Sequence, residues 1–279
     1  MMPNLAHLPE QLQKFKSKIA STLTTCIEFE REEVAQILPW QSNLRICPYL
    51  PLAMQYPKSK STGESLQFLG QINFAEMPRL ADFPEQGILQ FYLHMKEWGL
   101  GVDESLAAVQ DNHRVLYFPE VIEDTDILHT AEALAVADAL TDEDDQQLWV
   151  EPCRLVNFKC AEQYMTFHDY RFAPLMFGCE QVALSQDYDD LVVAYTEYEK
   201  PYTEQFQREG GHRIGGYANY LHATDHRTEF GIEDYMLLMQ LDTDEGLEWC
   251  DGGIAQWYIH PQDLKQRDFS KVVFLWACH

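Results

Sequence analysis

The sequence Gly-Ile-Leu-Gln-Phe-Tyr-Leu-His at residues 87–94 returns at residues 253–260 as Gly-Ile-Ala-Gln-Trp-Tyr-Ile-His. Alternate side chains of a β-strand lie on the same face. Each octapeptide therefore places Ile, Gln, Tyr and His on one face and only apolar side chains on the other. Because both faces are largely apolar, we expect both strands to be buried on both sides. The repeated octapeptide predicts a fold that is built twice from one β-rich unit.

Three further matches follow the same order in the two halves of the chain. They pair Arg45–Tyr49 with Arg213–Tyr217 as Arg-Ile-x-x-Tyr, Phe68–Asn73 with Leu237–Asp242, and Arg114–Tyr117 with Lys271–Phe274. Repeats in a fixed order indicate a duplicated structural unit. We place the two copies at about residues 45–117 and 213–274, with residues 118–212 between them.

The rest of the chain favours a few helices. Apolar residues three or four apart predict an N-terminal helix with one apolar stripe, formed by Leu5, Leu8, Leu12, Phe15, Ile19 and Leu23. Residues 129–140 predict a short helix capped by Thr130. Residues 184–209 are expected to be partly helical, with a break or kink at Pro201. Four prolines within residues 39–57 predict an irregular, extended segment.

These patterns predict a single, mainly β domain, α+β by content. We expect an internally duplicated, roll-like pseudo-twofold β assembly with an N-terminal helix and a helical insertion. Its parts are the N-terminal helix at 1–38, the first β repeat at 39–118, an acidic, partly helical insertion at 119–211, and the second β repeat at 212–279.

The charge balance narrows the classes of partner. The chain has 20 basic and 45 acidic residues among 279, a formal net charge of −25. Such a surface repels nucleic-acid phosphates and anionic lipid, so no nucleic-acid or membrane binding is expected. It favours solubility and can attract a basic protein partner.

Segment composition predicts a cytoplasmic location. No apolar run reaches the roughly 20 residues of a membrane span, and the N-terminus lacks the pattern of a signal peptide. The seven cysteines are odd in number and include no Cys-x-x-Cys pair. They predict reduced, mostly buried thiols and exclude a zinc site built on cysteine pairs.

The repeated polar stripe supplies the candidate ligand site. A buried glutamine has four hydrogen-bonding valences that must be met. The stripe either satisfies loop backbone groups around a pseudo-twofold axis or lines a ligand cleft between the copies. The candidate ligand-binding residues are Gln71, Gln90, Tyr92, His94, Arg213, Tyr217, Gln240, Trp249, Asp251, Gln256, Tyr258 and His260.

Three other constellations have a chemical and a purely structural interpretation. The glycine-rich residues 209–216 could cradle a phosphate, but glycines that a turn or bulge requires explain them better. His222, Asp225 and His226 would share one helix face and could ligate a metal, against a simple turn contact between Asp225 and Arg227. Residues 228–251 hold eight acids and no Lys or Arg, which indicates a solvated acidic hairpin around Gly246, a basic-partner footprint or an acid–base pair.

No known catalytic signature appears. The chain lacks Gly-x-Ser-x-Gly, dinucleotide-binding and kinase motifs, and no cysteine stands in a protease-like context. We therefore expect no catalytic residue and no cofactor, and the oligomeric state is left open.

The same segments resemble the YwqG-like family, a bacterial family of unknown function. The matching stretches are 68–78 (FLGQINFAEMP), 83–92 (FPEQGILQFY), 111–117 (DNHRVLY), 212–217 (HRIGGY), 237–242 (LLMQLD), 249–253 (WCDGG) and 268–278 (DFSKVVFLWAC), with looser matches at 155–158 and 169–172 (DYRF). The resemblance implies a mainly β, duplicated fold and no established activity. Because some members are encoded near secreted toxins, it also suggests an immunity or partner-binding role.

This chain departs from that family's pattern at four places. Ile46-Cys47 precede Pro48 where the family has Gly-Gly, and Cys250 replaces a glycine. His222-Ala223-Thr224 stands before Asp225-His226-Arg227 in place of a glutamine, and Ala277 replaces an aspartate.

Two functions follow as hypotheses. The leading one is a non-catalytic binding protein with a protein partner, in an immunity-type role. The rival is a small-molecule binder, or a hydrolase-like enzyme, that uses a polar cleft between the copies. A deep polar pocket where the copies meet favours the rival, whereas a flat acidic surface with exposed aromatics favours a protein partner.

Overall fold

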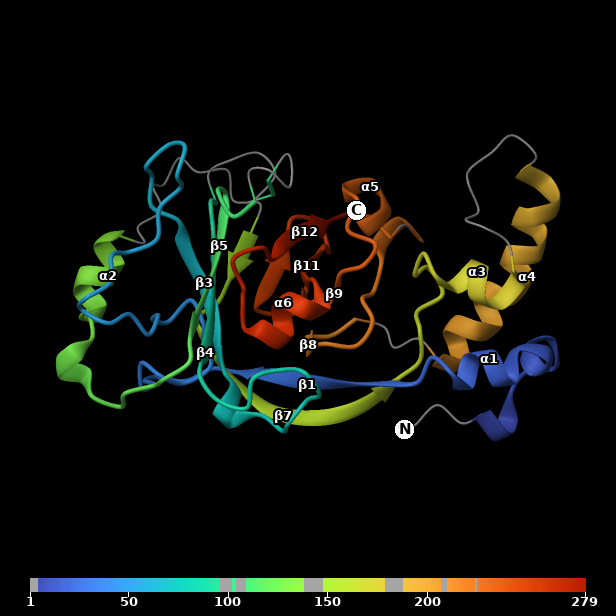
Figure 1. Ribbon diagram of the computed structural model, residues 1–279, viewed down its shortest axis with the longest axis horizontal. Coiled ribbons are helices and arrows are strands. Elements are labelled where there is room, and N and C mark those ends of the chain that lie inside the picture. Colours follow the sequence, from blue (N-terminus) through green and yellow to red (C-terminus); the bar gives the residue numbers. More distant parts are fainter. Residues whose placement is uncertain are drawn as a thin grey trace.

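A mainly antiparallel β structure organises the chain. The computed structural model describes residues 5–95, 102–103, 109–137, 148–178, 188–206, 210–223 and 225–279. Within them, ten strands form one antiparallel sheet in the order β12-β11-β9-β8-β1-β7-β2-β3-β4-β5, nearly closed into a barrel (Figure 1). These strands are β1 (Thr24–Glu32), β2 (Asn43–Leu44), β3 (Gln67–Asn73), β4 (Ile88–Leu93), β5 (His113–Phe118), β7 (Cys153–Gln163), β8 (Arg213–Ile214), β9 (Met236–Asp242), β11 (Ile254–Ile259) and β12 (Val273–Ala277). A separate two-stranded sheet pairs β6 (Leu148–Val150) with β10 (Leu247–Trp249).

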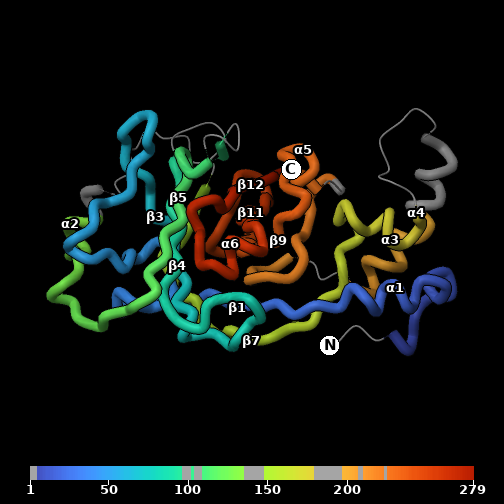
Figure 2. Tube along the Cα trace, viewed as in Figure 1, coloured from blue at the N-terminus to red at the C-terminus, as the bar shows by residue number. Residues whose placement is uncertain are grey.

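The strand order is symmetric about its centre. The two long strands β1 and β7 pair with each other and run side by side (Figure 2). β1 also pairs with β8, and β7 also pairs with β2. The repeated unit is therefore larger than the sequence predicted: β1–β5 forms one copy, and β7, β8, β9, β11 and β12 form the other. The first strand of each copy pairs with the second strand of the other copy.

This exchange of first strands corrects two predicted boundaries. Residues 1–38 are not one helix, because the helical stripe ends at Ala20 and β1 begins at Thr24. The β-branched and aromatic residues of β1 favour a strand, and its Ile27 and Phe29 are buried in the main core. The predicted insertion at 119–211 likewise contains a strand of the main sheet, the 11-residue β7.

The register of the sheet corrects two of the predicted matches between copies. Asn43 lies opposite Gln71, and Arg213 lies opposite Gln240, so Arg213 is equivalent to Asn43 and not to Arg45. Arg45 is instead equivalent to Gly215, and both have positive φ, at 54° and 69°. Arg114 lies opposite Tyr92, and Val273 lies opposite Tyr258, so Arg114 is equivalent to Val273 and not to Lys271. The octapeptides and the segments 68–73 and 237–242 align as predicted.

The helices lie mostly at the two ends of the molecule (Figure 1). Their bounds are η1 (Leu5–His7), η2 (Glu10–Phe15), α1 (Lys16–Ala20), η3 (Phe74–Glu76), η5 (Thr125–Ile127), α2 (Ala131–Ala137), α3 (Phe172–Phe177), α4 (Tyr188–Phe206), η6 (Leu221–Ala223), α5 (Arg227–Phe230) and α6 (Pro261–Gln266).

The helices near residues 130 and 200 were predicted. α2 confirms the helix expected at 129–140 as far as Ala137, because residues 138–140 lie outside the described residues. Ala133 N donates to Thr130 Oγ1 at 3.3 Å as a cap. α4 continues through Pro201, so the chain does not break there, and the kink given as the other possibility stays a prediction. Beyond the proline, Tyr202 and Phe206 are buried among aromatic side chains, and this packing holds the helix together.

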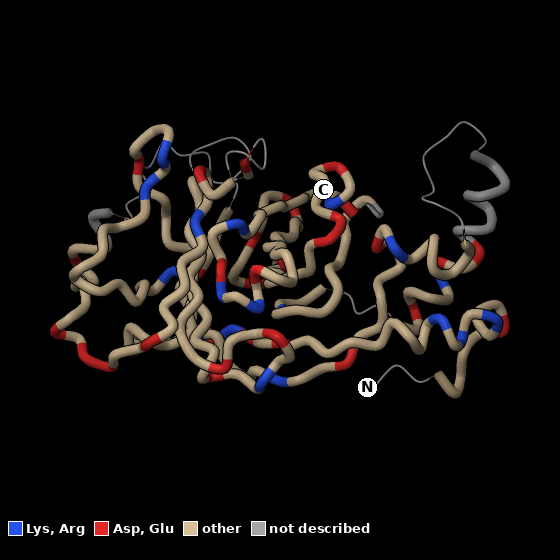
Figure 3. Tube along the Cα trace, viewed as in Figure 1, with Lys and Arg blue, Asp and Glu red and all other residues tan. Residues whose placement is uncertain are grey.

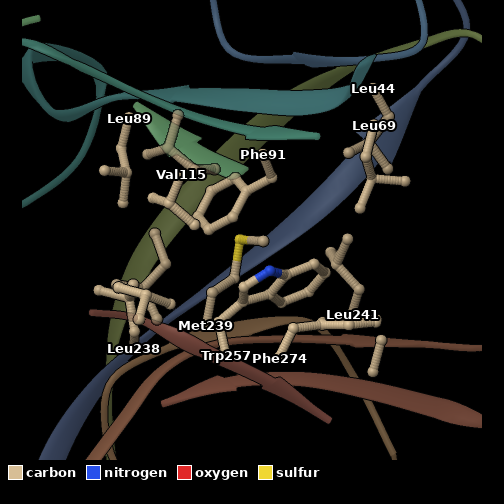
Figure 4. Packing of buried hydrophobic residues seen from close by; sticks show 14 of the residues in the cluster. Leu44, Leu69, Leu89, Phe91, Val115, Leu238, Met239, Leu241, Trp257 and Phe274 are labelled. Atoms are coloured by element: carbon tan, nitrogen blue, oxygen red, sulfur yellow. The ribbon is translucent and has the colours of Figure 1, made fainter. Parts of the chain in front are cut away.

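One apolar core joins the two copies. Side chains of β3, β4 and β5 face those of β9, β11 and β12 across it (Figure 4). The rings of Phe91 and Trp257, the equivalent residues of the two octapeptides, lie 5.0 Å apart between centroids. The apolar faces of the octapeptides are therefore the ones that meet, and their Gln/Tyr faces point away from the shared core.

The sheet stays open along one seam, between its edge strands β5 and β12. Side chains bridge it: Gln110 Nε2 donates to Phe269 O at 2.5 Å, and His113 Nε2 lies 2.8 Å from Val272 O. His113 Nδ1 lies 3.1 Å from the Asp103 carboxylate. The seam is thus held by side chains where the rest of the sheet is held by backbone ladders.

Candidate functional sites

In the first copy, the glutamine stripe is part of a closed hydrogen-bond network. Gln71 Oε1 accepts from Tyr49 N and from Gln90 Nε2, each at 2.8 Å. Gln90 Nε2 also donates to Tyr49 O at 2.8 Å, and Tyr92 Oη donates to Gln90 Oε1 at 2.9 Å. The segment before β3 is therefore fastened to the outer face of the sheet.

The second copy repeats this network. Gln240 Oε1 accepts from Asn219 N at 2.9 Å, and Gln256 Nε2 donates to Asn219 O and, at 3.4 Å, to Gln240 Oε1. Tyr258 Oη donates to Gln256 Oε1 at 2.7 Å. Each network stays within its own copy, so the glutamines do not line a cleft between the copies. They meet the backbone needs of a covering segment, which is the structural alternative.

Gln90→Leu and Gln256→Leu are each expected to lower the free energy of unfolding by about 1–3 kcal/mol, because each removes hydrogen bonds to a buried carbonyl and to a buried tyrosine hydroxyl. Urea denaturation measures the loss. The exposed Gln86, with one 3.4 Å bond to Pro119 O, is the control, and Gln86→Leu should cost less than about 0.5 kcal/mol. Losses no larger than this control would contradict the network's role.

The other predicted ligand residues are dispersed. His94 is buried beside Glu64 at 3.0 Å, and His260 caps α6 by accepting from Gln262 N. The Arg213 side chain donates to backbone carbonyls, including Gly210 O at 2.7 Å. Trp249 lies in the apolar core and Asp251 is exposed. Tyr217 and Tyr258 both line one cavity, described below.

The predicted metal ligands do not converge. His222 Nε2 lies 2.7 Å from Cys278 O, and His226 Nδ1 lies 3.0 Å from Glu229 Oε2. Asp225 is buried and accepts from Arg227, which is the turn contact weighed as the alternative. In the described part of the chain, no three potential ligands come together around one point.

The glycine-rich segment is explained by packing. Gly215 and Gly216 both have positive φ, and a Cβ on Gly216 would lie 2.5 Å from Gln163 Oε1 and 2.8 Å from Cys26 Cβ. The close approach of this turn to β1 and β7 therefore requires glycine. Glu209, at the start of the predicted phosphate loop, lies outside the described residues.

A cavity of about 580 Å³ lies where the two copies and the segment after β7 meet. We call it the junction cavity. Thr24 and Thr25 of β1 and residues 79–83 line it from the first copy; residues 215–218, Tyr220, Met236, Leu237 and Tyr258 line it from the second. Asp169 and Arg171 follow β7, and Arg227 begins α5.

Two Asp-x-Arg turns interlock at this cavity. Asp169 Oδ2 accepts from Arg171 Nη2 at 2.6 Å and from Arg227 Nη2 at 2.9 Å. The Asp225 carboxylate accepts from Arg227 Nε at 3.0 Å and Nη2 at 2.6 Å, and from Tyr170 N at 3.2 Å. Each turn thus fixes its own arginine, and Arg227 links the two turns.

These groups hold fixed charges. Burial by itself would raise the pKa of Asp169, but the hydrogen bond from Arg171 and the charge of Arg227 outweigh it, and the net pKa is lowered. Burial opposes the charge of Arg227 as well, yet its tyrosine and aspartate neighbours leave its pKa raised. Burial raises the pKa of Tyr258. None of the three groups is poised to exchange a proton near neutral pH, so this arrangement suits binding better than acid–base chemistry.

Arginines gather at the junction cavity of this acidic protein. Acidic residues occur along most of the described trace (Figure 3), but the cavity lining has three arginines against Asp82 and Asp169. The Arg171 side chain is 43% exposed, and its guanidinium lies over the Tyr217 ring at 5.5 Å. Arg171 is therefore accessible to a ligand while Asp169 holds its guanidinium in place.

The acidic segment at 228–251 forms the expected turn, but its centre is paired. Asp244 and Leu247 form an isolated bridge around Gly246. Arg31 binds both carboxylate oxygens of Asp244, at 2.8 and 2.5 Å, and His212 Nε2 lies 2.9 Å from Oδ2. His212 Nδ1 accepts from Asp242 N at 3.2 Å. His212 therefore links the Asp244 carboxylate to the backbone at Asp242.

The stability of the protein is expected to fall as the pH drops below about 4, the ordinary pKa of aspartate. Burial would raise the pKa of Asp244, but hydrogen bonds from His212 and Arg31 hold it well below its usual range. A lowered folded-state pKa stabilises the protein above the unfolded-state pKa, and this gain is lost in acid. Urea denaturation at pH 5 and pH 3 should show the fall, with a smaller fall for Asp244→Asn. Equal falls in both proteins would contradict this assignment.

Comparison with known proteins places the chain in a family. The model of a domain of unknown function, DUF1963, matches residues 44–278. The chain belongs to the DUF1963 family. No curated protein matches it significantly. The DUF1963 match begins in β2 and omits β1, although β1 is a central strand of the sheet.

In this DUF1963 chain, sequence reasoning missed the charged groups that pair across long distances. Asp169, Arg171 and Arg227 share the repeated Asp-x-Arg pattern, which is a usable signal, but Arg31 pairs with Asp244 without any local motif. The cysteines are less buried than predicted: among the six described, Cys26 and Cys153 are buried, and Cys160 and Cys250 are exposed. No helix among the described residues is both long and apolar enough to cross a bilayer.

Proposed function

We propose that this chain is a non-catalytic binding protein whose junction cavity holds a small molecule. The observation that carries the proposal is the cavity itself: both copies form it jointly, and its lining combines apolar side chains with arginines and aspartates. Ligand pockets commonly combine an apolar wall with a few fixed polar groups. Here Leu80, Phe83 and Met236 supply the wall, and Arg171 supplies the charge.

The buried ion pairs support binding without reaction. Asp169 and Asp225 already accept from arginines at 2.6–3.2 Å, so neither carboxylate is free to act as a base. Their role is to hold Arg171 and Arg227 in place. A ligand would meet a preformed site and would lose little affinity to reorganisation of the protein.

Native mass spectrometry of protein isolated gently from its source cells tests this proposal. We expect an added mass of a small molecule on the wild type and its loss in Arg171→Gln. Arg154→Gln is the matched control, because Arg154 pairs with Glu76 at 3.4 Å outside the cavity. A bare wild-type chain whose melting temperature no fraction of a cell extract raises would refute the proposal.

The resemblance to the YwqG-like family supports a bacterial origin for this protein. The free cysteines among the described residues support a cytoplasmic location for it.

A second candidate function is binding of a basic protein, in an immunity-type role. Three exposed apolar side chains belong to neighbouring segments: Leu52, Met54 and Ile122. Leu52 N donates to Ile127 O, and Ile122 N donates to Tyr49 Oη. Exposed acids accompany them at Glu120, Glu123, Asp124 and Asp126. Apolar residues within an acidic rim favour a partner with a basic, amphipathic surface.

A pull-down from the source cells tests this second candidate. A stoichiometric basic companion should be retained by the wild type and lost in Leu52→Lys and Ile122→Lys. Leu23→Lys is the control, because Leu23 is exposed in the turn between α1 and β1 and not on this surface. Retention of the same companion by all variants, or capture of random proteins only, would exclude this surface.

A further inference from the structure

A second cavity, of about 590 Å³, lies along the open seam of the sheet. We call it the seam cavity. The first copy contributes Arg114 and Tyr117 of β5, and the second contributes Arg267, Phe269 and Ser270 from the segment between α6 and β12. Lys60 lies at its edge. Anything bound there touches both copies where the backbone ladder is interrupted.

Within the described part of the chain, the two arginines of the seam cavity have no carboxylate partner. Arg114 donates to Gln110 O and Lys58 O, each at 3.1 Å. Arg267 donates to Leu264 O at 2.9 Å and Phe83 O at 3.1 Å. Among the described residues, no carboxylate oxygen lies within 4.0 Å of either guanidinium.

The one acid in the lining does not compensate them. The Asp268 carboxylate accepts from Ser270 N at 3.0 Å and from Ser270 Oγ at 2.6 Å. Counting side chains, the lining has three cations, Lys60, Arg114 and Arg267, against Asp268. A local charge of this sign is unexpected in a chain with a net charge of −25.

Burial makes the missing counter-ion costly. Burial lowers the pKa of Arg114, and the more distant charges of Asp111 and Asp103 only partly restore it. A half-buried guanidinium without a carboxylate is stabilised by any anion that reaches it. Guanidinium groups bind the oxygens of phosphate and carboxylate through paired hydrogen bonds.

We propose that the seam cavity binds a small molecule that carries an oxyanion, a phosphate or a carboxylate, between Arg114 and Arg267. The apolar body of the ligand lies against Tyr117 and Phe269, whose ring centroids are 5.0 Å apart. This site is separate from the junction cavity and does not depend on the function proposed for it. A bound oxyanion would join the two edges of the sheet and stabilise the folded protein.

Titration with phenyl phosphate and with benzoate, at constant ionic strength, tests the site. We expect saturable binding of at least one of them, a higher melting temperature, and weaker binding as salt is added. Arg267→Gln should weaken binding by about tenfold or more, since it removes a charge-assisted hydrogen bond. Binding of phenyl phosphate alone assigns a phosphate site, and binding of benzoate as well assigns a general oxyanion site.

Two variants make the outcome decisive. Arg267 also holds backbone carbonyls, so Lys60→Glu is the variant that keeps the packing: the Lys60 side chain is exposed. It should weaken binding with an unchanged near-UV circular dichroism spectrum. Arg171→Gln, in the junction cavity, should bind the probes as the wild type does. The proposal would be overturned if neither probe bound saturably at millimolar concentration. It would also be overturned if Lys60→Glu and folded Arg267→Gln both bound the probes with the affinity of the wild type.

Discussion

Replacing Arg227 by glutamine is expected to lower the free energy of unfolding by about 3–5 kcal/mol. Arg227 is 2% exposed and binds both Asp169 and Asp225, which are also buried. Without the guanidinium, two carboxylates would face each other in an interior with little water. Asp169 would keep its pairing with Arg171, but the buried Asp225 would lose its arginine partner or would have to take up a proton. Urea denaturation at pH 7 measures the loss.

An exposed ion pair supplies the control for this variant. Arg79 pairs with Glu85 at 2.8 Å, with side chains 79% and 59% exposed, so Arg79→Gln should cost less than about 1 kcal/mol. Adding Asp225→Asn to Arg227→Gln should recover part of the loss, since it removes one stranded charge. If Arg227→Gln were as stable as Arg79→Gln, the interlocked turns would not hold the junction cavity.

Trp257→Ala is expected to cost about 3–5 kcal/mol, because it opens a cavity in the core shared by both copies. The Trp257 ring lies 5.0 Å from Phe91 and 4.8 Å from Phe274. Since the side chain contacts both copies, the whole molecule should lose stability together. Urea unfolding should stay a single transition when followed by tryptophan fluorescence and by far-UV circular dichroism.

Trp257→Phe is the matched variant. It keeps an aromatic ring in the core and removes an indole N–H that finds no hydrogen-bond partner among the described residues. Its loss should therefore be well below that of Trp257→Ala. Two separate transitions in Trp257→Ala, with only half of the signal shifted, would mean that the copies have independent cores.

Much of the fold could be predicted from local pattern. The octapeptides at 87–94 and 253–260 became the equivalent strands β4 and β11, buried on both faces as expected. Strand periodicity and repeat order are properties of neighbouring residues, so they can be read from the chain. The exchange of β1 and β7 between the copies could not be predicted in this way. The partner of a strand is decided by residues that are far from it in the sequence.

The candidate site shows the same division. The sequence placed the glutamines on one strand face, but that pattern was compatible both with a structural network and with a ligand cleft. The structure shows that the glutamines bind the backbone of Tyr49 and Asn219 on the covering segments. The pairs Asp169–Arg227 and Arg31–Asp244 join residues 58 and 213 positions apart, with no spacing rule between them. They exist because the sheet brings their elements together.

The sequence by itself determined that this protein is acidic, mainly β and internally duplicated, because charge, period and repetition are encoded residue by residue. Only the tertiary structure decided that the apolar faces of the copies meet and that the glutamine faces turn outward. It also decided that the arginines collect at the junction and seam cavities. Those outcomes depend on which faces of the sheet pack together. The packing energy is distributed over residues that are far apart in the sequence and share no local pattern.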